Sequence, residues 1–137
     1  GAPESQLNSQ FVQIWPMSEA SVTGLNSSSV VKGTAPDVTI TLTDLYPDSV
    51  THAQVYPGPP VLDTAGTTVP GASLVISGTV PRNEQIFLKN WDEAIPNDGQ
   101  WTLEVLTTTA FGVDRLAFTT FTVDRAIKVN GAVTSAD

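Results

Sequence analysis

The chain has 137 residues, of which 40% are apolar and 15% are charged, a composition typical of one folded globular domain rather than of a disordered segment. Fourteen acidic against six basic residues give a net charge of −8, which disfavours nucleic acids and anionic membrane surfaces as partners. Cysteine is absent, which excludes disulfide bridges, thiolate catalysis and cysteine-ligated zinc, and no apolar run approaches the ~18 residues of a membrane-inserted helix.

The N-terminal quarter carries weak strand signals. Residues 1–10 are polar or small and are expected to form a flexible arm or linker. The apolar run 11–15 stops at Pro16, which predicts an edge strand because proline has no N–H to donate to a sheet ladder. Trp15, in this run, is assigned to the core. The pair Val30–Val31 belongs either to a strand or to a loop.

A period of two marks the central strands. Val38, Ile40 and Leu42 alternate with threonines, and successive side chains of a strand point to opposite faces of its sheet. The three aliphatic side chains are therefore expected in the core. After a turn at residues 46–48, residues 52–56 predict another strand with one apolar and one polar face.

Proline and glycine interrupt the middle of the chain. The run Pro57–Pro60 cannot lie in a central strand, because three of its four residues lack an N–H, and it is expected to be a loop or an edge. Residues 64–70 predict a turn-rich excursion. Short strands are expected at residues 74–76 and 86–88.

The last third contains the strongest pattern. Residues 97–99 signal a turn, after which the large apolar side chains of residues 101–105 share one face of a strand. The final strand changes phase in its middle, which predicts a β-bulge near Thr119 and Thr120. Gly112 is expected to supply the positive φ of the hairpin loop that joins the two strands.

These signals together predict an all-β fold, a two-sheet immunoglobulin-like sandwich of about seven antiparallel strands, with residues 38–42 packed against residues 101–105. The stretches DGQWTLEV and FTTFTVD resemble the C-terminal half of bacterial immunoglobulin-like domains, whose penultimate strand reads D-G-x-[YW]-T-hydrophobic-x-V and whose last strand ends in T-F-x-V-D. The matching positions are Asp98, Gly99, Trp101, Thr102, Leu103, Val105, Phe121, Val123 and Asp124. The resemblance implies an extracellular, cell-surface or virion setting and a role as spacer, stalk, accessory module or virion decoration.

Catalysis has little support in the sequence. The one histidine, His52, is expected on the polar face of a strand. Ser49, three residues away, would point to the opposite face, so the two cannot form a simple dyad. The motifs of serine hydrolases, zinc proteases and P-loop proteins do not occur. We therefore expect no enzyme and no cofactor.

One loop offers oxygen ligands for a metal ion. Asp92, Glu93, Asn97 and Asp98 are clustered in the sequence, and calcium prefers several carboxylate and carbonyl oxygens. The same residue types also build ordinary turns. Two interpretations therefore stay open: a calcium site, and a turn whose acidic side chains are solvated.

Aromatic side chains are the other candidates for binding. Trp91, Tyr56 and Phe111 are expected in loops or on outward faces, where a ring could stack on a sugar. Trp91, beside Asp92, is the best single candidate for a carbohydrate-binding module that also uses loop carboxylates. The alternative for Trp91 is a cap over the open end of the sandwich, because large aromatic side chains are usually buried.

The expected function is that of a non-catalytic structural or adhesive module of a bacterial surface protein, secreted protein or phage virion. Its domain is expected to span residues 11–124, with residues 125–137 forming a C-terminal arm or linker. Such an arm can add a strand to the sheet edge of a neighbour. Protein neighbours are therefore the expected partners, and a glycan is the second candidate.

Overall fold

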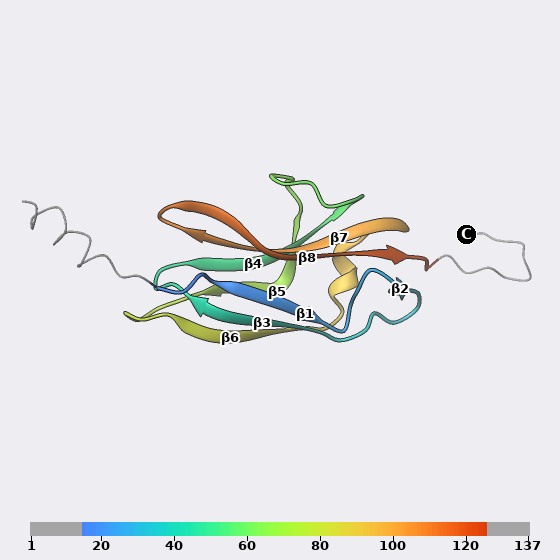
Figure 1. Ribbon diagram of the computed structural model, residues 1–137. Helices are drawn as coiled ribbons and strands as arrows, with labels where there is room; N and C mark the ends of the chain where they lie inside the picture. The colour runs from blue at the N-terminus through green and yellow to red at the C-terminus, as the bar shows by residue number, and fades with distance from the viewer. Residues whose placement is uncertain (1–14, 126–137) are drawn as a thin grey trace, which may run out of the picture.

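The computed structural model describes residues 15–125, which form eight β-strands and one short 3₁₀ turn. The strands make two sheets that pack face to face in an elongated sandwich (Figure 1). The described chain begins at one end of the sandwich and leaves at the other, and these are named the Trp15 end and the Arg125 end. Within this part of the chain, no helix is long and apolar enough to cross a membrane.

Each sheet has a simple strand order. The first sheet is ordered β1 (Glu19–Thr23), β3 (Val38–Leu45) and β6 (Arg82–Leu88). The second is ordered β2 (Val30–Val31), β8 (Gly112–Val123), β7 (Gly99–Thr109), β4 (Val50–Pro57) and β5 (Thr67–Val75). The 3₁₀ turn η1 (Trp91–Ala94) connects β6 to β7. β2 and β8 pair in parallel, and the other pairs are antiparallel.

The strand order agrees with the predicted fold class. If β1, β3 and β6 are taken as strands A, B and E, and β4, β7 and β8 as strands C, F and G, the order is that of an immunoglobulin-like sandwich. β3 and β4 are consecutive strands that lie in different sheets, as are β5 and β6, whereas β4–β5 and β7–β8 are neighbours within one sheet. Several strand pairs, such as β4 with β7, therefore join residues far apart in the sequence. The all-β, two-sheet prediction is confirmed, with eight strands in place of about seven.

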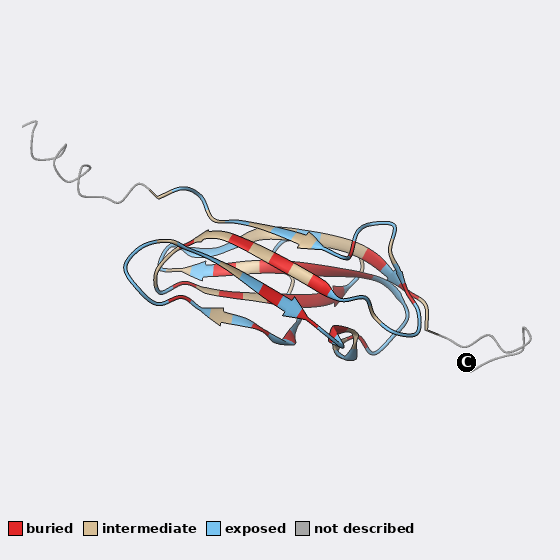
Figure 2. Cartoon of the chain, turned by 90° about the horizontal axis from the view of Figure 1, so that it is seen from below, coloured by how far each residue is buried: buried red, intermediate tan, exposed pale blue. Residues whose placement is uncertain are grey.

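The core lies between the sheets, where the alternation placed it. Val38, Ile40 and Leu42 on β3 are at most 1% exposed, and Leu103 and Val105 on β7 are fully buried. All five belong to one hydrophobic cluster, and buried residues follow the strands in Figure 2. Removing such side chains from water stabilises the fold by about 1.5–3 kcal/mol each. The predicted packing of these two segments from opposite layers is confirmed.

The bulge of β8 lies away from its predicted position. The register between β7 and β8 shifts between Val105 and Leu106, which leaves Leu116 as the extra residue. Leu116 packs against the core, whereas Phe118 stays on the outer face with 47% of its surface exposed. The bulge predicted at residues 119–120 is therefore wrong, because that prediction assumed that Phe118 is buried.

The N-terminal strand also differs from the expectation. β1 presents only Ala20 and Val22 to the core, and two small apolar residues give little periodic signal. The strand predicted at residues 11–15 lies outside the described residues except for Trp15. Trp15 is only half-buried and contacts the ring of Tyr46, with the centroids 5.1 Å apart, so its assignment to the core is wrong.

β5 begins at Thr67, inside the segment that was expected to be turn-rich. Pro70 and Gly71 lie where the register between β4 and β5 shifts, which marks a bulge. β5 is an edge strand, and a proline on an edge need not donate a ladder hydrogen bond. β5 therefore accommodates Pro70 and Gly71, two residue types that in a sequence usually indicate a turn.

Candidate functional site

Trp91 is a structural residue at the Arg125 end. Its side chain is 1% exposed and meets the ring of Phe121 edge to face, with the centroids 5.4 Å apart. The indole Nε1–H donates to the carbonyl oxygen of Pro36 at 2.8 Å. Because a stacking platform needs an exposed ring face, the structure supports a cap and not a sugar platform at Trp91.

The other two candidate aromatics lie on other parts of the sandwich. Tyr56 is 2% exposed, on the outer face of β4 beneath the loop of residues 58–66. Phe111 is 93% exposed, in the two-residue connection between β7 and β8 at the Trp15 end. The structure therefore does not bring Trp91, Tyr56 and Phe111 into one binding site, and only Phe111 offers an exposed ring.

The guanidinium of Arg125 lies among the acidic residues proposed for calcium. Nη1 is 3.6 Å from the carboxylate of Asp92 and Nε is 3.8 Å from that of Asp98. Nη2 donates to the carbonyl oxygen of Ile95 at 2.5 Å, and Nη1 to that of Asp92 at 3.3 Å. The main-chain N–H of Arg125 also donates to Asp98 at 3.1 Å. Arg125 thus ties the end of the described chain to the 3₁₀ turn and to the loop after it.

The remaining two residues of the proposed calcium site serve the turn. Glu93 is exposed, and the carbonyl oxygen of Asn97 accepts the indole N–H of Trp101 at 2.9 Å. Among residues 15–125, no group of three or more histidine, cysteine, aspartate and glutamate side chains has the arrangement of a metal site. A calcium ion bound here would have to displace the guanidinium of Arg125 from Asp92 and Asp98.

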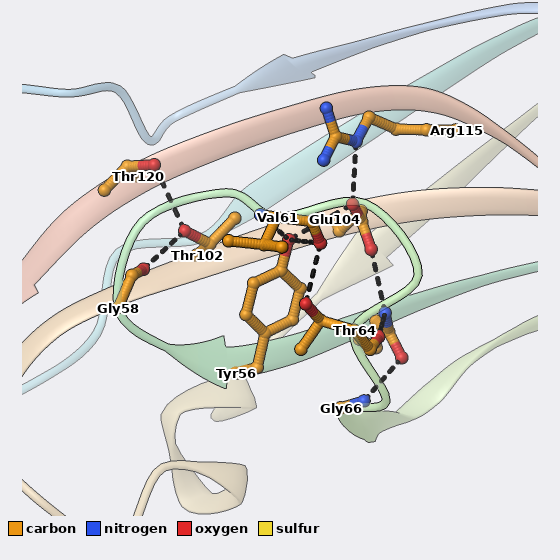
Figure 3. A network of polar contacts seen from close by, with 10 residues as sticks. Tyr56, Gly58, Val61, Thr64, Gly66, Thr102, Glu104, Arg115 and Thr120 are labelled. Carbon is orange, nitrogen blue, oxygen red and sulfur yellow. Dashed lines mark hydrogen bonds and ion pairs between the residues drawn. The ribbon is translucent and has the colours of Figure 1, made fainter.

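A buried polar cluster centres on Glu104 of β7 (Figure 3). The carboxylate accepts hydrogen bonds from Nε of Arg115 at 2.7 Å, from Nε2 of Gln54 at 2.8 Å and from the hydroxyl of Tyr56 at 3.1 Å. Only 2% of the Glu104 side chain is exposed. A buried carboxylate is stable when it is paired and hydrogen-bonded, and Glu104 has both an ion pair and two neutral donors.

The cluster fastens the loop of residues 58–66 over the outer face of the five-stranded sheet. Gln54 donates to the carbonyl oxygen of Thr64 at 2.9 Å and accepts the N–H of Gly66 at 3.0 Å. The N–H of Val61 donates to the hydroxyl of Tyr56 at 3.3 Å. At the start of the loop, Thr102 donates to the carbonyl oxygen of Gly58 at 2.8 Å. The prediction of a loop is confirmed for residues 58–60, whereas Pro57 is the last residue of the central strand β4, paired with Trp101, so its exclusion from a central strand was wrong. A strand can end on a proline because the missing N–H is needed only if the ladder continues.

Burial raises the pKa of the Tyr56 hydroxyl above its ordinary value of 10.0. The N–H of Val61 opposes this shift, because it stabilises the phenolate, whereas the negative charge of Glu104 adds to it. Tyr56 therefore stays protonated and donates to Glu104. The arrangement holds a loop in place, and the Glu104 carboxylate is already bound by Arg115, Gln54 and Tyr56.

One feature of the sequence points to this cluster, which was not predicted. Glu104 stands between Leu103 and Val105 on the polar face of a strand, where a solvated side chain was the simplest interpretation. Its cover comes from a loop about 40 residues earlier, and its ion-pair partner Arg115 from the next strand. A charged residue in the middle of an otherwise apolar central strand is the signal that could have raised the question of a buried pair.

An open groove of about 290 Å³ lies at the Trp15 end. Its walls include Met17, Tyr46, Thr109, Phe111 and Asp114. Tyr46 is held by the ring of Trp15 and by its own hydroxyl, which donates to the carbonyl oxygen of Pro16 at 3.0 Å. These contacts fasten the incoming chain to the sandwich, as Arg125 fastens the outgoing chain at the other end.

No protein-family description matches this chain, and no curated protein matches its sequence. Its fold is similar to that of a mutant β-glucosidase from Listeria innocua in complex with laminaribiose, with a TM-score of 0.47 and 12% identity, covering 79% of this chain and 16% of that chain. It is also similar to the CARDB domain of a Pyrococcus furiosus protein in complex with di-metal ions, with a TM-score of 0.44 and 11% identity, covering 82% of this chain and 90% of that chain. The chain therefore spans only a small part of the β-glucosidase, and similarities this weak concern the fold alone.

Proposed function

We propose that this chain is a non-catalytic spacer module that transmits mechanical tension along an extracellular, cell-surface or virion protein. The observation that carries the proposal is that the described chain arrives at one end of the elongated sandwich and leaves at the opposite end (Figure 1). Modules of this geometry can be joined in series without folding back on each other. The resemblance of residues 98–105 and 118–124 to bacterial immunoglobulin-like domains supports the same setting.

Both chain ends are tied to the body of the domain. At the Trp15 end, Ser18 donates to the carbonyl oxygen of Asp44 at 2.7 Å, and Tyr46 binds the main chain at Pro16. At the Arg125 end, the guanidinium of Arg125 contacts the 3₁₀ turn and the loop after it. Tension applied to the chain therefore reaches the sheets directly at both ends.

The terminal strands are loaded in shear. β1 is attached along its length to β3, and β2 pairs in parallel with β8 through hydrogen bonds from the N–H of Thr122 to Ser29 at 3.1 Å and from that of Asp124 to Val31 at 2.8 Å. Because the chain leaves in opposite directions, tension slides these strands along their neighbours, and several hydrogen bonds resist together. Opening a hairpin from its end would instead break them one at a time.

The polar residues of the described chain fit a structural role better than a catalytic one. The carboxylate of Glu104 is occupied by three donors. His52 lies on β4 between Ser73 and Leu106 of the neighbouring strands, so its registered neighbours provide no carboxylate to orient the imidazole as a general base. We therefore propose that the chain is not an enzyme. The alternative of a carbohydrate-binding module that uses Trp91 is not supported, because the Trp91 ring is buried.

Single-molecule force spectroscopy tests the proposal. The chain has no cysteine, so introduced cysteines define the attachment points without interference. Pulling through the two chain ends is compared with pulling through cysteines at Met17 and Phe111, which are 80% and 93% exposed at the same end. We expect a higher unfolding force through the chain ends, because unfolding under load is controlled by the unfolding rate. Equal or lower resistance through the chain ends would contradict the proposal.

A further inference from the structure

We propose that the groove at the Trp15 end binds a neutral saccharide, with Phe111 as the stacking platform and Asp114 and Thr109 as hydrogen-bonding groups. This site is at the opposite end of the sandwich from Trp91 and the acidic turn. It goes beyond the spacer role, because a module that transmits tension needs no ligand of its own. With a volume of about 290 Å³, the groove is at the lower limit of small-molecule sites.

Phe111 is exposed, and its main chain is held by the turn. The N–H of Phe111 donates to Oγ1 of Thr109 at 3.0 Å. Gly112 closes the turn with a φ of +127°, which residues other than glycine rarely adopt. Thr109 and Gly112 are paired in the β7–β8 ladder. The ring is thus presented at the tip of an ordered hairpin, so little main-chain freedom remains to be lost when a ligand binds.

The rest of the groove has the mixed chemistry of a sugar. Met17, 80% exposed, and the half-buried Tyr46 add apolar surface opposite the C–H face of a pyranose. Thr109 uses its oxygen to accept from Phe111, which leaves its proton free to donate to a sugar hydroxyl. The exposed carboxylate of Asp114 can accept from one. An apolar ring face beside a few directed polar groups is the usual composition of such a site.

The charges of the groove favour an uncharged ligand. The positive charge of Arg115, which also lines the groove, is balanced by Glu104 at 2.7 Å. Asp114 then leaves the groove slightly negative, in a chain whose net charge is −8. A uronate or a sulfated sugar would be repelled by this field. The structure therefore favours neutral hexoses over acidic glycans.

The test titrates the full chain with neutral gluco-, galacto- and manno-oligosaccharides, and in parallel with uronate-containing oligosaccharides, by calorimetry and by tryptophan fluorescence. Trp15 packs against Tyr46 of the groove, so its emission should change on binding. We expect binding of a neutral oligosaccharide, weakened about tenfold or more by Phe111→Ala and retained by Phe111→Trp. Phe87→Ala is the matched control, because Phe87 is an exposed aromatic (65%) on β6, away from the groove.

Three results would overturn the proposal. The first is no binding of any neutral oligosaccharide at millimolar concentration, or binding only of the uronate series. The second is equal binding by Phe111→Ala and the parent chain, with both melting at the same temperature. The third is binding that appears only after residues 1–14 are removed, which would mean that the groove serves the chain's own N-terminal segment. None of these results bears on the force measurement, so the two proposals fail independently.

Discussion

The carboxylate of Glu104 accepts a hydrogen bond from Nε of Arg115 at 2.7 Å, and only 2% and 18% of the two side chains are exposed. This pair lies on the outer face of a sheet, where side chains normally meet water. The cluster around Glu104 is buried because the loop of residues 58–66 covers it (Figure 3). Gln54 and Tyr56 connect the pair to that loop. The stability of the loop and the state of the buried charge are therefore coupled.

Removing the carboxylate should destabilise the domain. Glu104→Ala leaves Arg115 without its counter-charge and Gln54 and Tyr56 without an acceptor, and loss of one partner of a buried pair typically costs about 3 kcal/mol. Glu84→Ala is the matched control, because Glu84 pairs with Arg82 at 2.6 Å but on the surface, where side-chain exposures are 26% and 48%, and such pairs contribute less than about 1 kcal/mol. Urea unfolding of both variants measures the difference. Similar losses in the two variants would show that the Glu104 cluster is not effectively buried.

The hydroxyl of Tyr56 should make stability depend on alkaline pH. The folded state holds this proton more tightly than the unfolded chain, whose tyrosine pKa is 10.0. The stabilisation is complete below pH 10 and is lost as the pH rises from 10 through the raised folded pKa. Tyr56→Phe should cost about 1–2 kcal/mol at neutral pH, because the hydrogen bond to Glu104 is lost, and should flatten the decline above pH 10. Melting temperatures across this range, with absorbance of the tyrosinate, provide the measurement.

The sandwich was predictable because its signal is local. The alternation of Val38, Ile40 and Leu42 with threonines fixes which face of β3 is buried, whatever the rest of the chain does. The same holds for β7. The bulge in β8 was only partly predictable, because the change of phase is visible in the sequence whereas its position depends on whether Leu116 or Phe118 reaches the core.

The candidate site was less predictable, because its determinants lie far apart in the sequence. Trp91 is buried by Phe121 and held by a carbonyl 55 residues away, and neither contact has a local pattern. In the sequence, Asp92 and Asp98 resemble metal ligands, and only the structure shows that Arg125 contacts both carboxylates. Phe111 was identified as an exposed ring because a residue at the tip of a short hairpin has nothing to cover it.

Arg125 should make the acidic turn indifferent to calcium. Because its guanidinium already contacts Asp92 and Asp98 and two main-chain carbonyls, we expect the same melting temperature in calcium and in chelator. Arg125→Ala should destabilise the domain by about 1–2 kcal/mol, mainly through the lost carbonyl contacts, and should make the melting temperature rise with calcium. Lys89→Ala, which removes an exposed ion pair with Asp37, should change neither quantity. A calcium response in the parent chain would instead support the site at Asp92, Glu93, Asn97 and Asp98.

Gly66 should be the position at which the loop is most sensitive to added volume. A Cβ atom there would lie 2.6 Å from the carbonyl oxygen of Val55 and 3.1 Å from the side chain of Gln54, so Gly66→Ala must lift the loop from the sheet at a cost of about 1–3 kcal/mol. Gly33→Ala is the control, because nothing lies within 4 Å of its added Cβ. Lifting the loop admits water to Tyr56, so the pKa of Tyr56 in Gly66→Ala should fall back toward 10.0, the value from which burial raises it. Hydrogen exchange at the Val61 amide should accelerate in the same variant, and unchanged exchange together with an unchanged tyrosine titration would show that the loop is not held by this contact.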